Sequence, residues 1–199
     1  MTESKNCLLS ELLFVDGGII KTETLNNNGF TSRDISHLLK EGVLEKIKQG
    51  HYVRKNRIIS DIEIAARLIP MGVLCLFNAI EHYELATVNP SKICMSLPRG
   101  VTCPTLPSNL IVQIYHMTSR HYMAGINEVE TGKVLVKMYD IEKTVCDCFK
   151  YDHNIEKGIA LEVLKNYVVK GNCNVQKLLE YAKLLGKKKT IYPYVEALI

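Results

Sequence analysis

The sequence of 199 residues contains no tryptophan, and none of its apolar runs approaches the roughly 18 residues that a membrane-spanning helix requires. It also lacks the phosphate-binding motifs G-x-x-x-x-G-K-[ST] and G-x-G-x-x-G, the nucleophile motif G-x-S-x-G and the zinc motif H-E-x-x-H. These absences argue against a transmembrane protein and against several large classes of enzyme. Acidic residues interrupt the first 30 positions, so we expect no signal peptide and a cytoplasmic protein.

The cysteines do not have the pattern of a disulfide framework or of a metal site. There are seven, an odd number, and no two are spaced as C-x-x-C, which predicts reduced thiols. Cys146 and Cys148 would not face each other on a helix, so we expect buried thiols at both positions. His116 and His121 have no carboxylate or thiol at ligand spacing, and we therefore expect neither a metal nor a cofactor.

The composition is that of a globular chain, with 47% hydrophobic and 23% charged residues. The net charge of +4 is unevenly distributed, with +2 over residues 1–60, −2 over residues 61–142 and +4 over residues 143–199. Basic ends around an acidic middle are compatible with one or two surfaces for polyanions, although ordinary solvated charge gives the same pattern.

The first 30 residues contain signals for two helices. Four leucines between Leu8 and Leu13 have helical spacing and predict a helix over residues 4–15, which the following Gly17-Gly18 ends. Thr22 is a suitable N-cap for a second, short helix that reaches Asn28.

A third helix carries the most informative surface. Thr31 and Asp34 have the spacing of a helix capping pair, and Gly42 is a typical stop, so we expect a helix that ends near residue 41. Ile35, Leu38 and Leu39 would form its apolar face. Five residues that can all form hydrogen bonds, none of them acidic, fall on the opposite face: Ser32, Arg33, Ser36, His37 and Lys40.

Two short strands follow this helix. Residues 44–48 and 51–54 flank Gln49-Gly50, which is a two-residue hairpin signal. The predicted hairpin carries four basic or titratable side chains, Lys46, Lys48, His51 and Arg54. Two helices, an amphipathic third helix and a basic hairpin are the order of a winged helix-turn-helix domain, which we assign to residues 1–58.

Such a domain would place the third helix in the major groove of double-stranded DNA. Arg33, in its first turn, has the fork that matches guanine, and the hairpin lysines would contact phosphates. Protein-interaction modules use the same elements, so a winged helix without DNA remains an alternative. Arg33 could also form an ion pair with Glu23 or Asp34 rather than contact a base.

The remainder of the chain, residues 59–199, predicts a mixed α/β domain, and the fold class is α+β. Helical spacing covers residues 61–69, 73–83, 155–170 and 175–185, and extended segments cover 93–97, 110–117, 125–130 and 134–139. Thr131-Gly132-Lys133 would join the last two strands as a hairpin loop. Lys143 and Asp147 would form a weak i, i+4 ion pair on a helix, with Glu142 near the helix start, so we favour a structural over a catalytic role.

Several of these segments resemble the AbiEi-type antitoxins, a family of abortive-infection toxin–antitoxin systems. The family pattern L-x-x-G-x-L followed by a wing ending in G-x-Y is matched by Leu39, Gly42, Leu44, Gly50 and Tyr52. Its S-A-L-x-x-H-G-L segment corresponds to residues 78–85, with matches at Ala79 and Leu85. Its E-R-T-Φ-x-D motif, in which Φ is apolar, is matched at Glu142, Thr144, Val145 and Asp147, with Lys143 in the place of arginine.

This resemblance implies a DNA-binding antitoxin of a type IV system, which represses its own operon at repeated half-sites. Its functional partner would be a nucleotidyltransferase-like toxin, neutralised without a stable complex. The motif residues Glu142, Lys143, Thr144 and Asp147 would maintain the fold or serve antitoxin activity. The alternative is a winged-helix regulator whose second domain senses a ligand or partner. No catalytic constellation is evident, so we do not expect an enzyme.

Overall fold

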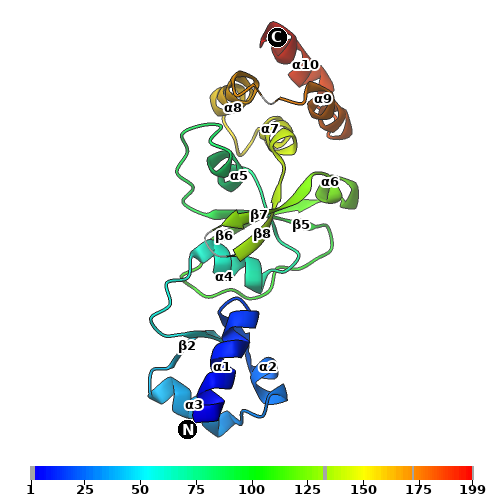
Figure 1. Ribbon diagram of the computed structural model, residues 1–199. Coiled ribbons are helices and arrows are strands. Elements are labelled where there is room, and N and C mark those ends of the chain that lie inside the picture. Colours follow the sequence, from blue (N-terminus) through cyan, green and yellow to red (C-terminus); the bar gives the residue numbers. More distant parts are fainter. Residues whose placement is uncertain (1–2, 132–133, 172, 199) are drawn as a thin grey trace. The chain divides into compact units, whose positions relative to one another are not determined.

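The computed structural model describes residues 3–131, 134–171 and 173–198, which form helices and two separate β-sheets (Figure 1). This confirms the mixed α+β class. The chain divides into two compact units. Unit 1 runs to Leu68 and also contains Thr105–Leu110, whereas unit 2 contains Ile69–Pro104 and the chain from Ile111 onward.

Unit 1 consists of short helices around a three-stranded antiparallel sheet. Its elements are α1(Glu3–Val15), β1(Ile19–Lys21), α2(Thr22–Asn27), α3(Ser32–Lys40), β2(Leu44–Lys48), β3(His51–Arg54) and α4(Asp61–Leu68), and the strand order is β1-β3-β2. The core contains Leu9, Leu13, Ile20, Leu25, Phe30, Ile35, Leu38, Leu44 and Tyr52. All the predicted helices and strands of this region are present; β1 was not predicted, because three residues are too few for an alternating pattern.

The start of α3 follows the local prediction closely. The Thr31 hydroxyl accepts a hydrogen bond from the Asp34 amide at 3.2 Å, and the Asp34 carboxylate accepts one from the Thr31 amide at 2.8 Å. Lys5 of α1 also donates to this carboxylate at 2.9 Å. The Thr31 amide, together with Lys5, holds the pKa of Asp34 well below its usual range, so the carboxylate remains charged and ties α3 to α1.

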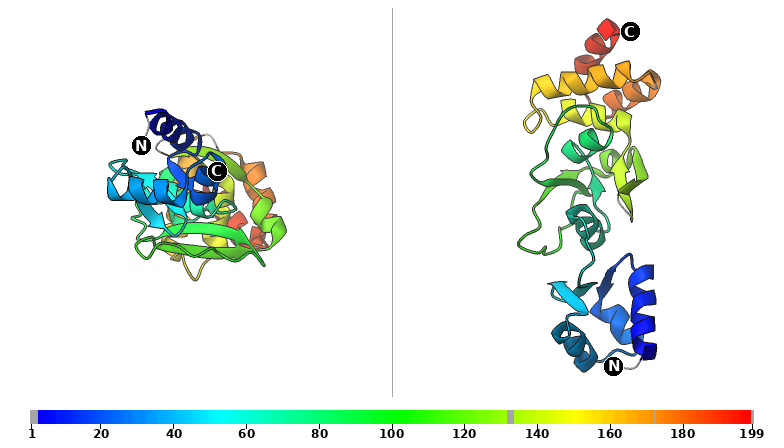
Figure 2. Two further views of the ribbon diagram at one scale, coloured as in Figure 1. Left: turned by 90° about the horizontal axis from the view of Figure 1, so that it is seen from below. Right: turned by 60° about the vertical axis from the view of Figure 1, so that its left-hand side comes forward.

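Unit 2 is built on a five-stranded mixed sheet of order β6-β5-β4-β8-β7. The β4–β8 and β5–β6 pairs are parallel, and the β4–β5 and β7–β8 pairs are antiparallel. Its elements are β4(Val73–Leu74), α5(Phe77–His82), β5(Ile93–Pro98), β6(Val112–Met117), α6(Ser119–Met123), β7(Ile126–Thr131), β8(Val134–Tyr139), α7(Ile141–Lys150), α8(Lys157–Val169), α9(Val175–Leu184) and α10(Lys188–Leu198). Helices α7 to α10 gather together beside the sheet, as Figure 2 shows, and their apolar faces continue its core.

The prediction of one helix over residues 73–83 is wrong. Val73 and Leu74 form the central strand β4, and the helix begins only at Phe77. The four residues from Val73 to Leu76 are all fully buried. A strand covered on both faces reads as a continuous apolar run, which by spacing alone cannot be told from one side of a helix.

Helix α6 was not predicted from the sequence. Of the predicted loop Thr131-Gly132-Lys133, only Thr131, the last residue of β7, lies within the described residues. The predicted domain boundary between residues 58 and 59 falls inside unit 1, which continues to Leu68. Over the described ranges, no helix is long and apolar enough to cross a membrane.

Candidate functional site

Helix α3 presents a polar face that is free of packing contacts with the core. Ile35 and Leu38 are buried, whereas the five predicted site residues Ser32, Arg33, Ser36, His37 and Lys40 are all exposed. Arg33 forms no ion pair with any described residue, and Asp34 is bound by Lys5 and Thr31 instead. The guanidinium group of Arg33 is therefore available to an external partner.

His37 differs from its neighbours on this face. Its Nδ1 atom lies 3.2 Å from the Glu41 carboxylate, one turn further along α3. This acid at the end of the helix was not included in the predicted surface. The exposed face therefore carries Arg33 in its first turn and both basic and acidic side chains, Lys40 and Glu41, at its end.

The four predicted residues of the hairpin do not form one surface. Residues that lie directly opposite on antiparallel strands share a face, and Lys46 is opposite the buried Tyr52, whereas Lys48 is opposite His51. Because Tyr52 and His51 are neighbours on β3, they point to opposite faces. Lys46 therefore lies on the same face as Tyr52 and Arg54, and Lys48 lies with His51 on the other face.

Each of these side chains also has a partner within unit 1. The Lys46 ammonium donates to the Gln49 side chain at 2.6 Å, and Lys48 donates to the Thr105 carbonyl at 3.0 Å. Arg54 donates to the Ser10 hydroxyl at 3.3 Å. Burial, together with the nearby Lys48, lowers the pKa of His51, so this ring is uncharged at neutral pH.

The predicted site residues Glu142, Lys143, Thr144 and Asp147 lie at the start of α7, in the interior of unit 2. Lys143 and Asp147 form an ion pair whose Nζ–oxygen distances are 2.6 and 2.7 Å, and their side chains are 0% and 1% exposed. The Lys143 ammonium also lies 4.2 Å from the centre of the Tyr139 ring. The expected i, i+4 ion pair is therefore present, but the packing of the surrounding helices buries it, so it is not the weak pair of a solvated helix.

Two more carboxylates of this region join three helices. Asp140 caps α7, and Lys177 of α9 lies 3.0 Å from both the Asp140 and the Glu142 carboxylates. The Tyr167 hydroxyl of α8 donates to Glu142 at 3.1 Å, and the Thr144 hydroxyl donates to the Asp140 carbonyl at 2.8 Å. The arrangement fixes α7, α8 and α9 relative to one another, and the motif carboxylates are buried among their partners.

The buried thiols were predicted correctly. Cys146 and Cys148 are both fully buried, and their thiols donate to the carbonyls of Leu178 and Thr144. Burial raises the pKa of both thiols, which keeps them protonated and unreactive. Within the described segments, no group of three His, Cys, Asp or Glu residues is arranged to hold a metal ion.

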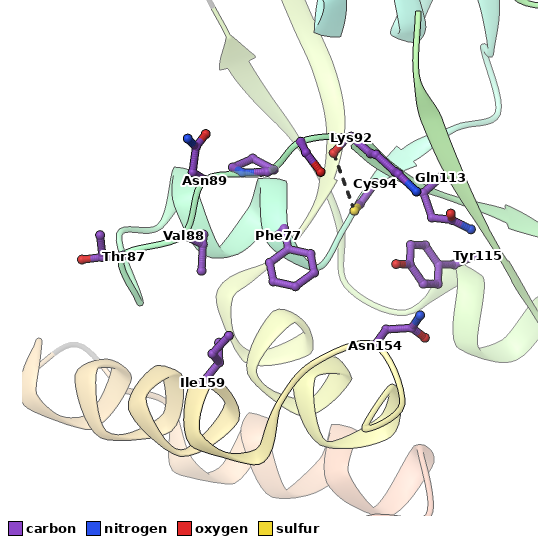
Figure 3. A pocket seen from close by; sticks show the side chains of 12 residues that line it. Phe77, Thr87, Val88, Asn89, Lys92, Cys94, Gln113, Tyr115, Asn154 and Ile159 are labelled. Carbon is purple, nitrogen blue, oxygen red and sulfur yellow. Dashed lines mark hydrogen bonds between the residues drawn. The ribbon is translucent and has the colours of Figure 1, made fainter.

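Unit 2 contains a cavity that the sequence did not indicate (Figure 3). Its volume is about 450 Å³, which is within the range of small-molecule sites. The lining combines rings, aliphatic groups, amides and a lysine, from five segments of the chain: Phe77, Thr87, Val88, Asn89, Pro90, Ser91, Lys92, Cys94, Gln113, Tyr115, Asn154 and Ile159. Such a site could not be found from spacing, because these segments are distant in the sequence.

The backbone beside this cavity is unusual. Leu76, between β4 and α5, has φ 47° and ψ −121°, a backbone conformation that residues other than glycine rarely adopt. Leu76 is followed by Phe77, which lines the cavity, and by Asn78. The Asn78 side chain accepts a hydrogen bond from the amide of Cys94, another lining residue, at 2.7 Å. The strained turn therefore positions two neighbouring parts of the cavity lining.

Comparisons with protein-family models and with curated proteins give no match. Among solved structures, the crystal structure of the RV2827C protein from Mycobacterium tuberculosis is similar, with a TM-score of 0.63 and 14% sequence identity. The similarity covers 88% of this chain and 70% of that chain. At this level of identity it shows that the two chains share a fold.

Proposed function

We propose that unit 1 is a winged helix-turn-helix domain that binds double-stranded DNA through α3. The observation that carries this proposal is the exposed polar face of α3, with Arg33 in its first turn and without an ion-pair partner among the described residues. In this class of domain, the N-terminal residues of the second helix of the pair contact base edges in the major groove. The order of three helices and a three-stranded sheet in unit 1 supports the assignment.

We further propose that the protein is an antitoxin that represses its own operon, and that it has no enzymatic activity. This step rests on the resemblance of residues 29–53 and 140–147 to the AbiEi-type family. Unit 2 would then neutralise a nucleotidyltransferase-like toxin without forming a stable complex with it. The burial of Glu142, Lys143, Thr144 and Asp147 supports a role in maintaining unit 2 rather than in contacting a partner.

Two experiments test these steps separately. A labelled duplex from the region upstream of the gene should bind the full chain, with an affinity that exceeds that for a scrambled duplex at the same salt concentration. Equal affinity for both duplexes would contradict sequence-specific repression. Co-expression with the adjacent gene should restore growth if that gene encodes the toxin, and continued growth arrest would contradict the antitoxin role.

The second candidate function is a regulator whose unit 2 senses a small molecule. The cavity of about 450 Å³ with its mixed lining supports this candidate. A sensing regulator would change its DNA affinity when the cavity is filled, whereas an antitoxin would not need to. The Val88→Trp substitution narrows the cavity. It should alter repression if the protein is a sensing regulator, and it should leave growth rescue intact if the protein is an antitoxin.

A further inference from the structure

Three arginines of unit 1 surround the turn that follows α1. Arg54 belongs to β3, Arg57 follows this strand, and Arg67 lies in the last turn of α4. The guanidinium of Arg67 lies where a Cβ atom at Gly17 would be, and that of Arg57 lies where one at Gly18 would be. Both glycines have positive φ, 64° and 93°, so the turn favours glycine for its conformation and requires it for the close approach of the two cations.

The three arginines bring three positive charges to this turn. In the parts of the chain that the structure describes, none of the three arginines has a carboxylate partner. Arg54 donates to the Ser10 hydroxyl at 3.3 Å. At the other end of α1, by contrast, Lys5 is paired with Asp34 at 2.9 Å.

Capping of α1 does not account for the arginines. The carbonyls of Leu12, Leu13 and Phe14 in the last turn accept hydrogen bonds from the amides of residues 16–18, at distances between 2.6 and 3.1 Å. The turn itself therefore satisfies these acceptors. Among the described residues, Arg57 and Arg67 donate no hydrogen bond to this helix end.

A cavity of about 200 Å³ opens beside the turn, and it is lined by Ser10, Leu13, Phe14, Gly18, Arg54 and Arg57. Its polar wall offers two guanidinium groups and a hydroxyl, and Phe14, which is 87% exposed, stands at its edge. Guanidinium groups bind phosphate oxygens through paired hydrogen bonds, and adjacent arginines without carboxylates favour an anion over a cation or a neutral group.

We propose that Arg54, Arg57 and Arg67, with the Ser10 hydroxyl, form a binding site for a phosphate group. The turn at Gly17-Gly18 follows the last residue of α1, which lies about 15 Å along the helix from Lys5, the residue that contacts α3, and Ser10 lies about 7.5 Å from Lys5. The site is distinct from the exposed face of α3, and it shares Arg54 with the hairpin residues predicted to contact DNA. The phosphate group could belong either to a nucleic-acid backbone or to a free phosphorylated compound.

Thermal unfolding of the full chain in inorganic phosphate tests the site, with sodium chloride at matched ionic strength as the reference. The melting temperature should rise with phosphate concentration and approach saturation, because a ligand that binds only the folded state stabilises it. The Arg57→Gln and Arg67→Gln variants should lose this phosphate-dependent rise. Arg33→Gln, the same substitution at another unpaired arginine of unit 1, should retain it.

The outcomes separate the site from general effects of salt and from a purely structural role. A wild-type protein without a phosphate-specific rise, or an equal loss of the rise in Arg33→Gln, would overturn the proposal. If Arg57→Gln lowers the melting temperature in chloride, direct titration by phosphorus NMR of the folded variant decides whether binding is lost. Arg67→Lys, which keeps the charge but not the fork, should weaken phosphate binding as well.

A second measurement identifies the source of the phosphate. Binding of a duplex of arbitrary sequence is compared between the wild type and Arg57→Gln. A weaker complex with a shallower salt dependence assigns the site to the nucleic-acid backbone. Unchanged duplex binding, together with lost phosphate binding, assigns it to a free phosphorylated compound.

Discussion

Arg33 is the residue whose surroundings most directly favour recognition of a base. Its side chain is exposed in the first turn of α3, and the acid next to it, Asp34, is engaged by Lys5 and Thr31. The ion pair with Glu23 or Asp34 that the sequence left open is not formed. The local capping box therefore has a second effect, since it removes the nearest competitor for the arginine.

Replacement of Arg33 by alanine should relax the preference for one base pair in each half-site. A bidentate contact to guanine contributes about 1–3 kcal/mol of discrimination against other bases. Competition binding against operators with single-base changes measures this preference. Unchanged preference with lower overall affinity would mean that Arg33 contacts the backbone rather than a base.

Lys143 and Asp147 show how strongly burial changes the contribution of an ion pair to the free energy of unfolding. A surface pair contributes little, whereas removing one partner of a buried pair costs about 3–5 kcal/mol, because the other charge remains buried. Burial raises the pKa of Asp147, although Lys143 opposes this shift. The loss of either partner should therefore lower the stability of unit 2.

We expect Lys143→Met to destabilise the protein by about 3–5 kcal/mol in chemical denaturation. The double variant Lys143→Met, Asp147→Leu should recover most of this loss, because no charge is left uncompensated. Lys187, whose pair with Asp152 at 2.9 Å is partly exposed, provides the control: Lys187→Met should cost less than about 1 kcal/mol. Equal effects at positions 143 and 187 would contradict the importance of burial.

At the scale of elements, the hairpin of β2 and β3 carries its basic residues on two faces. Lys46 and Arg54 share one face, and Lys48 is held on the other by the Thr105 carbonyl. The segment Thr105–Leu110 thus belongs structurally to unit 1, although 36 residues of unit 2, Ile69–Pro104, precede it in the sequence. The two lysines are therefore not equivalent in the way that the sequence suggested.

Lys46→Ala should weaken binding to all DNA sequences alike and should reduce the slope of affinity against salt by about one unit. Lys48→Ala should have a smaller effect, because Lys48 is half-buried and lies on the other face of the hairpin, whereas Lys46 is exposed. Titration of both variants at several salt concentrations gives the two slopes. Slopes that fall by the same amount would indicate that both lysines reach phosphates.

At the scale of the whole molecule, two units with separate cores allow two separate activities. A fragment that starts at residue 60 should not bind the promoter, but it would also lack most of unit 1, against which residues 105–110 pack. The full chain with Arg33→Ala and Lys40→Ala is a cleaner test, because both side chains are exposed and neither contributes to a core.

We expect this double variant to lose repression, with promoter affinity reduced roughly tenfold or more, and to retain the ability to rescue growth. A reporter under the promoter and co-expression with the adjacent gene measure the two activities in the same cells. Loss of both activities in a variant that folds normally would show that they are not separable.

The features that depend on neighbouring residues could be predicted from the sequence alone. Thr31 and Asp34 cap α3, Gln49-Gly50 closes the hairpin, and the apolar spacing in α3 fixes which side chains are exposed. Each of these depends on residues within a few positions of one another, so the pattern carries the information. The features that depend on distant segments could not be predicted and become visible only in the folded chain. Tertiary structure turned Val73–Leu74 into a central strand, buried the Lys143–Asp147 pair, and brought Arg57 and Arg67 onto Gly17-Gly18, because each outcome is set by packing against residues far away in the chain.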